Sequence, residues 1–334
     1  MITPTRLSYG VLIATIALAV LLHLGVPLLV LLFSYFALRQ LYFLTKRKWL
    51  ALVLFIVVVA AIAAAAVYFT RVAFLALPDV AESSIPSASA WAQRRQIELP
   101  FTDFESLRSV VIDTLKQEAH YLRNVAHFAR STTTALVFTI IGIVAAVSLF
   151  FKTGLDPYRS THAVKNNLYS ICCDEVSKRF RDFYRSFATV MGAQITISLI
   201  NTALTGIFLV AVRLPHAPLL IAVTFLCGLV PIVGNLASNT VIVFVALTVS
   251  LKLAIVALVF LILIHKLEYL LNSKIIGDRI RNPVWLTLIA LILGERLMGI
   301  PGLILAPVVL NYLRVEMLTV EVPAPSETVE ALNC

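Results

Sequence analysis

Two interruptions in the apolar C-terminal part of the chain decide its fold: Gly-Leu-Val-Pro-Ile-Val-Gly-Asn at 228–235 and Gly-Ile-Pro-Gly at 299–302. The apolar runs before them, 218–230 and 284–298, are shorter than the roughly 20 residues that a helix needs to cross a bilayer. In hydrocarbon, a broken helix survives only where protein or a water-filled cavity surrounds its unpaired backbone groups. The sequence therefore predicts two hairpins that enter the membrane, turn and return, with a cavity at their tips.

The composition is typical of an integral membrane protein. Of 334 residues, 60% are hydrophobic and 13% are charged, whereas about 25% are charged in a typical soluble domain. The net charge of +9 comes from short basic segments between apolar runs, without an RRM, zinc-finger or basic-helix pattern, so nucleic acid is not expected as a partner. The four cysteines show no metal-ligand spacing, and we expect neither a metal nor a cofactor. The expected fold is an all-α bundle that spans the membrane several times.

Hydropathy and composition divide the chain into consecutive segments. Prolines and serines predict a linker after the third span, and apolar residues at steps of three and four between Phe104 and Leu122 predict an amphipathic helix. The expected segments are a three-span region (1–70), an extracytoplasmic linker with the amphipathic helix (71–131), a fourth span (132–151), a basic cytoplasmic segment (152–186), a core with both broken hairpins (187–313) and a cytoplasmic tail (314–334).

Basic clusters set the expected orientation. Lys46 to Lys48 form the first cluster, basic residues exceed acidic ones between Lys152 and Arg185, and a third cluster lies between Lys274 and Arg281. Loops rich in lysine and arginine stay in the cytoplasm. Both termini are therefore expected to be cytoplasmic, and the segment 84–123 is expected outside. The N-terminal run has no Ala-x-Ala cleavage signal, so we interpret it as a retained first span.

The fifth apolar span carries a polar face. Gln194, Ser198, Asn201 and Thr205 occur at offsets that place them on one side of a helix. Polar side chains in a membrane helix either line a pathway or bond to another helix, and both interpretations are open here. The candidate residues of a substrate pathway combine this face with the two breaks: Gln194, Ser198, Asn201, Thr205, Pro231, Gly234, Asn235, Gly299, Pro301 and Gly302.

Few ionisable residues lie near the breaks. His265, Glu268 and Asn272 recur at steps of three and four, hence on one helical face. A carboxylate with a histidine can relay protons or hold a cation. Glu268 can also lie at the interface and pair with a nearby lysine or arginine, so this second interpretation is open. The candidate residues for binding a coupling ion, H⁺ or Na⁺, are His265, Glu268, Asn272 and Glu295.

Four motifs follow one another in the C-terminal half: Pro-Ile-Val-Gly at 231–234, EYLLNSKIIG at 268–277, Asn-Pro-Val-Trp at 282–285 and GERLMGIPGLILAPVVL at 294–310. This order resembles the autoinducer-2 exporter superfamily of bacterial membrane permeases. Many relatives have Asn-Pro-Lys where this chain has Asn-Ser-Lys at 272–274, so the helix end there can have a different shape.

The resemblance implies a function. It implies a secondary transporter in the bacterial cytoplasmic membrane that exports a small molecule, or exchanges cations for protons, as a homo-oligomer, with a pentamer expected, in which a transport part moves against a scaffold. The expected partners are the lipid bilayer, a small-molecule substrate and H⁺ or Na⁺. A channel is a competing interpretation. An enzyme is disfavoured because the sequence has no His-Glu-x-x-His, Gly-x-Ser-x-Gly or Walker phosphate-loop pattern.

Overall fold

The computed structural model describes residues 4–94, 120–152, 156, 164, 167–230, 233–275 and 283–319, and every regular element in these ranges is an α-helix. Five of the helices contain a stretch that is long and apolar enough to cross a membrane. This confirms the prediction of an all-α, multi-spanning membrane protein. In chain order the helices are α1 (Pro4–Leu21), α2 (Gly25–Thr45), α3 (Lys48–Arg94), α5 (His120–Phe151), α6 (Leu168–Ala211), α7 (Ala217–Gly228), α8 (Val233–Val249), α9 (Leu251–Ile275), α10 (Val284–Met298) and α11 (Ile300–Leu318).

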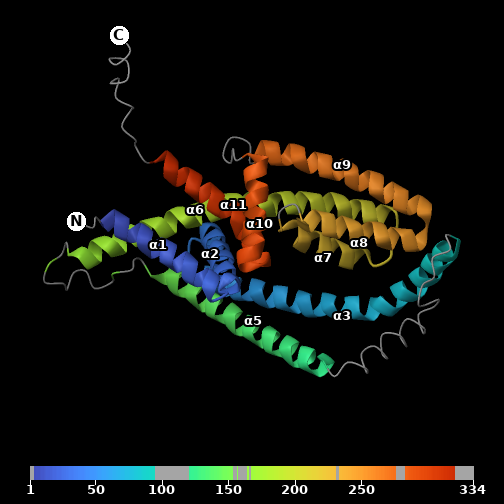
Figure 1. Cartoon of the computed structure of the whole chain (residues 1–334), viewed down its shortest axis with the longest axis horizontal. Helices are drawn as coiled ribbons and strands as arrows, with labels where there is room; N and C mark the ends of the chain where they lie inside the picture. The colour runs from blue at the N-terminus through green and yellow to red at the C-terminus, as the bar shows by residue number, and fades with distance from the viewer. Residues whose placement is uncertain are drawn as a thin grey trace, which may run out of the picture.

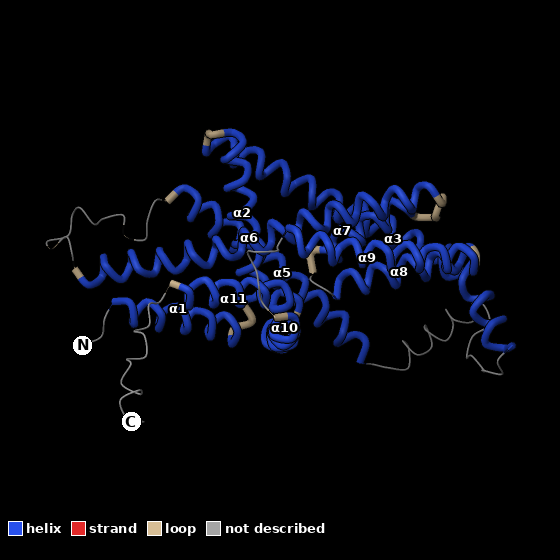
Figure 2. Tube along the Cα trace, turned by 90° about the horizontal axis from the view of Figure 1, so that it is seen from above, coloured by secondary structure: helices blue, strands red, loops and turns tan. Residues whose placement is uncertain are grey.

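Helix α6 connects the two halves of the molecule. It is 44 residues long, and α1 and α11 pack along its N-terminal part while α7 and α9 pack along its C-terminal part (Figure 1). Seen from the second direction, α1 and α11 again lie together, apart from α7, α8 and α9 (Figure 2). Because one continuous helix belongs to both groups, it fixes the distance between them.

Three apolar clusters hold these helices together. One joins α6, α7, α8 and α9 around Leu209, Ile242 and Leu261. A second joins α2, the middle of α6 and α11 around Phe187. The third joins α2, α3 and α5 around Leu38. Large apolar side chains also stay exposed on the outer faces of α3, α5, α8 and α9, which is expected where lipid rather than water surrounds the protein.

Helix α3 corrects one expectation. The prolines and serines after residue 71 predicted a linker, but α3 continues through Pro78 and Pro86 to Arg94. An apolar span already supplies the costly helical nucleus, and the alanines and leucines that follow favour propagation. Proline in a helix interior removes a backbone hydrogen bond and bends the axis, and the last part of α3 turns away from its first part (Figure 1).

Other boundaries also differ from expectation. Helix α6 begins at Leu168, inside the segment expected to be a separate cytoplasmic one, because Asn167 caps its first turn by accepting a hydrogen bond from the Ser170 N–H at 2.8 Å. Helix α5 begins at His120, ahead of the expected fourth span. Most of the expected amphipathic helix, residues 101–119, lies outside the described residues.

The two breaks have different shapes. Helix α7 has 12 residues and is followed by α8 after a short connection of which 231–232 are not described. Only Gly299 separates the 15 residues of α10 from α11, and its φ of +64° is accessible mainly to glycine. Helix α10 stands across the neighbouring helices (Figure 1) and is seen end-on in Figure 2. Val230 and Met298, one from each break, pack against the same cluster around Phe187.

Candidate functional site

The first two residues of the predicted polar face of α6, Gln194 and Ser198, bond to the end of α7. The Gln194 amide donates to the carbonyl of Gly228 at 2.7 Å, and the Ser198 hydroxyl donates to the carbonyl of Phe225 at 2.9 Å. The last carbonyls of a helix lack partners within that helix. The two side chains therefore stabilise the first break in this conformation, and Gly228 is needed there because a Cβ would collide with Ser198.

A buried polar chain starts one turn further along α6. The Asn201 amide faces the Asn235 carbonyl oxygen on α8 at 3.5 Å, and the Asn235 amide donates to Glu268 on α9 at 2.6 Å. Both asparagines are buried, and the Glu268 side chain is 12% exposed. Three helices thus place two amides and one carboxylate in contact. Donation by an amide favours the ionised carboxylate, whereas its burial opposes charge.

His265 extends this chain toward the surface. Its Nδ1 lies 4.0 Å from the second carboxylate oxygen of Glu268, one turn away on α9, and its side chain is 70% exposed. Within the described residues Glu268 forms no ion pair with a lysine or arginine, Lys266 included. Lys274 and Arg279, the next basic residues along the chain, lie where side chains are not described. The imidazole is therefore the ionisable group that the structure places beside Glu268.

The inner face of α6 also carries oxygen atoms without hydrogen-bond partners. These buried atoms are Asn201 Oδ1, Thr202 Oγ1 and Thr205 Oγ1. Carboxylate, carbonyl and hydroxyl oxygens are the ligands that hard cations prefer. The crevice between α6 and α9 that Asn201 and Glu268 line leaves no room for a water molecule. In this conformation the crevice is too narrow for a hydrated cation.

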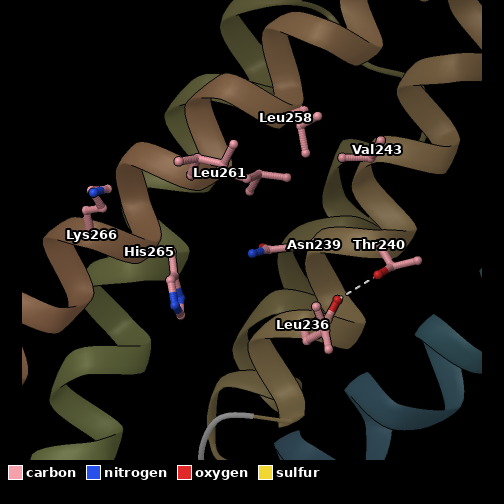
Figure 3. A pocket seen from close by; sticks show the side chains of 9 residues that line it. Leu236, Asn239, Thr240, Val243, Leu258, Leu261, His265 and Lys266 are labelled. Atoms are coloured by element: carbon pink, nitrogen blue, oxygen red, sulfur yellow. Dashed lines mark hydrogen bonds between the residues drawn. The ribbon is translucent and has the colours of Figure 1, made fainter.

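A larger groove lies between α8 and α9. Its volume is about 640 Å³, within the range of small-molecule sites. Its walls are mainly leucine, isoleucine and valine, including Val243 and Leu261. Asn239 and His265 extend into the space between the two helices (Figure 3), and Lys266 lines it as well. The groove and the buried chain therefore meet at His265.

Comparison with known proteins identifies the family. The model of the AI-2E family transporters matches residues 9–319, nearly the whole chain. The chain belongs to the AI-2E transporter family.

Two curated relatives carry transport names. The Bacillus subtilis (strain 168) protein "Putative transport protein YdbI" is 28% identical over 187 residues, which cover 55% of this chain and 51% of that protein. A Thermotoga maritima protein, "Putative transport protein", is 25% identical over 177 residues, which cover 52% of this chain and 49% of that protein. The chain spans about half the length of the curated relatives it matches.

The remaining candidate residues of this AI-2E family member lie in other places. The carboxylate of Glu295 is exposed on α10 and pairs with no described residue, so it is not part of the buried chain. Gly299, Pro301 and Gly302 lie at the second break, where Pro301 packs close to Gly25 on α2. Gly234 packs against the backbone of Cys227. Pro231 and the side chain of Asn272 lie outside the described residues.

Two features of this AI-2E family member were not predicted from its sequence. Asn239 reaches the groove, and its position four residues after Asn235 is a signal that helical periodicity could have supplied. The second feature is an ion pair between Arg179 on α6 and Glu316 on α11. The Tyr9 hydroxyl on α1 donates a hydrogen bond to the Glu316 carboxylate at 2.7 Å. These three residues come from distant parts of the chain, and no local pattern links them.

Proposed function

We propose that this protein is a secondary membrane transporter that exports a small molecule and is driven by a proton or sodium gradient. The observation that carries the proposal is the buried chain Asn201–Asn235–Glu268, which ends at His265 beside the groove between α8 and α9. An ionisable group inside a membrane protein is costly and therefore marks a functional site by default. The names of the two relatives support transport as the class of activity.

The groove supports a small organic substrate. It combines mainly apolar walls with a few polar groups, Asn239 and His265 among them, which is the usual construction of a small-molecule site. A substrate there would be largely apolar and would carry one or two hydrogen-bonding groups. Its binding would change the surroundings of His265, and so of Glu268.

Coupling would work through the charge of Glu268. A protonated Glu268 removes the negative charge from the buried cluster, whereas the ionised form attracts a proton or a cation. The narrow crevice beside Asn201 favours the proton, because a proton needs no additional space. The unpartnered oxygens of Thr202 and Thr205 favour a second candidate function, cation/proton antiport without an organic substrate.

The proposed mechanism is alternating access by the two broken hairpins. Helices α7 and α10, at about 1.5 Å per residue, reach only about 18 and 22 Å, short of a hydrocarbon core of about 30 Å. Opposed hairpins with tips inside the membrane are a common way to build a transport site. We further propose a homo-oligomeric scaffold, of which a pentamer is one form, in the bacterial cytoplasmic membrane with both termini in the cytoplasm. We do not propose an enzymatic activity.

Proteoliposomes containing the purified protein and a pH-sensitive dye test the proposal. An imposed sodium or proton gradient should drive a saturable proton flux across the proteoliposome membrane, which the dye reports. Glu268→Gln should abolish this coupled proton movement. Glu295→Gln is the matched control, because it makes the same change at an exposed carboxylate that is not part of the buried polar chain. Flux that rises linearly and uncoupled from either gradient would indicate a channel. Proton movement that Glu268→Gln leaves intact would contradict the proposed role of Glu268.

A further inference from the structure

A second groove lies between α1, α2 and the N-terminal part of α6, whereas the polar chain begins in the C-terminal part of α6. Its volume is about 290 Å³, and nearly all of its wall is apolar. Helix α1 contributes one complete face, from Ser8 to Ala19 at helical spacing. At 1.5 Å per residue this face is about 16 Å long. The space is thus narrow and elongated, as an aliphatic chain is.

The groove opens onto the surface that faces lipid. Val11 and Ile16 line it, yet they are 41% and 40% exposed. Ala19 and Leu32, in contrast, are buried at its inner wall. A chain from the bilayer can therefore enter from the side, between α1 and its neighbours, without passing through a polar region.

One charged group lines the groove. Arg179 on α6 is 5% exposed, pairs with Glu316, and lies 4.1 Å over the ring of Tyr9. Its Nη2 is 3.8 Å from Glu175. Its Nε is buried and has no hydrogen-bond partner in the described part of the chain. A buried N–H without an acceptor is destabilising, so this atom is suited to a ligand that brings one.

The surroundings of Arg179 decide the chemistry of that acceptor. Two carboxylates, Glu316 and Glu175, already face the guanidinium, so an additional anion would be repelled. An uncharged carbonyl oxygen accepts from Nε without this repulsion. Arg179 precedes Phe187, the expected start of the fifth span, by about 12 Å of helix. This places Arg179 outside the hydrocarbon core on the predicted cytoplasmic side, next to the layer that holds the head groups and ester groups of phospholipids.

We propose that this groove binds one acyl chain of a glycerophospholipid from the cytoplasmic leaflet, with an ester carbonyl accepting the Arg179 Nε–H. The apolar face of α1 contacts the chain, and the paired carboxylates keep the guanidinium in place. The bound lipid fills the space between α1 and α6. The site is separate from the polar chain of the transport proposal, and its test needs no transport.

Photolabelling tests the site directly. The full-length protein is reconstituted in phosphatidylcholine that contains a fraction with a photoactivatable acyl chain, and the labelled residues are mapped by mass spectrometry. Labelling should concentrate on Leu12, Ile16 and Phe180 of the groove. Labelling spread equally over Ile13 and Leu18, which are 65% and 54% exposed on α1, would show lipid at the surface only and overturn the proposal.

Two variants separate lipid binding from misfolding. Ala19→Phe fills the groove and should reduce its labelling about fivefold or more, whereas Ile13→Phe adds the same ring on the exposed face and should leave it unchanged. Arg179→Lys keeps the charge for Glu316 but lacks the Nε donor, so native mass spectrometry should show less retained phospholipid. Unchanged labelling of the groove in Ala19→Phe would overturn the site.

Discussion

Glu268 is the residue on which the polar chain depends. A nearly buried carboxylate is stable as an anion only if donors or cations surround it. Among the described residues Glu268 receives one amide donor, from Asn235, and His265 lies at 4.0 Å. An ionised carboxylate has about four acceptor sites, so one amide satisfies it only in part. Its state therefore depends on what else binds, which is the property that a coupling site requires.

Asn201→Leu tests the other end of the buried polar chain. The substitution removes the donor that faces Asn235 while keeping a similar volume, and an interhelical bond in a membrane is worth only about 0.6 to 2 kcal/mol. We expect the protein to assemble normally and to transport about tenfold more slowly, because Asn235 loses its partner. Thr196→Val on the exposed side of α6 is the control. Unchanged flux at equal membrane abundance would mean that Asn201 serves only the contact between helices.

Helical periodicity predicted the polar faces that carry Asn201 and Glu268, but it did not predict which residues of the polar chain contact one another. It placed Asn201 on the polar face of α6 and Glu268 on a face with His265, because both patterns are local. The contact between them depends on how α6, α8 and α9 are rotated about their axes, which neither pattern specifies. Asn235 was selected only as part of the break, and the structure places it between Asn201 and Glu268.

At the scale of elements, the α10–α11 hairpin is held by close backbone approach. A Cβ at Gly302 would collide with the backbone of Gly294, and a Cβ at Gly294 would collide with that of Gly302. Gly299 turns the chain at φ +64°, ψ −141°. The sequence predicted the break, because Gly and Pro interrupt an apolar run there. Gly294 was not predicted, since a glycine inside a helix has no local signature of its partner.

Gly302→Ala tests this approach. The added methyl group meets backbone, which cannot move away as a flexible side chain can, so we expect a loss of about 1 to 3 kcal/mol in the free energy of unfolding. A lower Tm of the detergent-purified protein would report it. Gly192→Ala is the matched control, because its Cβ would meet only Phe36 at 3.9 Å. An equal Tm for both variants would contradict the close contact.

Gly299→Ala tests the cost of the backbone conformation alone, without a steric clash of the added methyl group. No atom lies within 4 Å of a Cβ built at Gly299, so only the backbone angle opposes a side chain. Such a conformation costs a residue with a Cβ about 1 to 3 kcal/mol. We expect a lower Tm here as well, and Gly299→Asn should lose about as much as alanine, because ψ −141° lies outside the left-handed helical region that asparagine tolerates. A Tm unchanged by alanine would show that the corner adopts other angles in the membrane.

At the scale of the whole molecule, the two broken elements converge although they are far apart in sequence. Val230 and Met298 pack against one cluster formed by α2, α6 and α11. We expect cysteines at these two positions to form a crosslink with a short bifunctional reagent, in a background without native cysteines. Val230→Cys with Ile13→Cys, on the lipid-facing side of α1, is the control pair. No crosslink between the two breaks under any condition would contradict the proposal that both hairpin tips meet inside the membrane.

The ends of the helical core also meet. Tyr9 near the start of α1 donates to Glu316 near the end of α11 at 2.7 Å, so both ends lie on the same side of the molecule (Figure 1). The sequence placed both termini on one side from the basic clusters alone, without any indication of this contact. Charge in loops predicts which side of the membrane a segment occupies, but it carries no information on which helices touch.

Cysteine labelling in intact cells tests the orientation itself. Ser89→Cys, near the end of α3, and Thr319→Cys, which follows α11, are each introduced after the native cysteines have been replaced. Because the basic clusters predict cytoplasmic termini, a membrane-impermeant maleimide should label residue 89 in intact cells and residue 319 only after the membrane is opened. Thr319 is exposed, so a lack of labelling there before opening reflects the membrane rather than burial. The opposite pattern would show that the protein has the inverted orientation in the membrane. Labelling of both positions in intact cells would mean that α3 and α11 end on the same side.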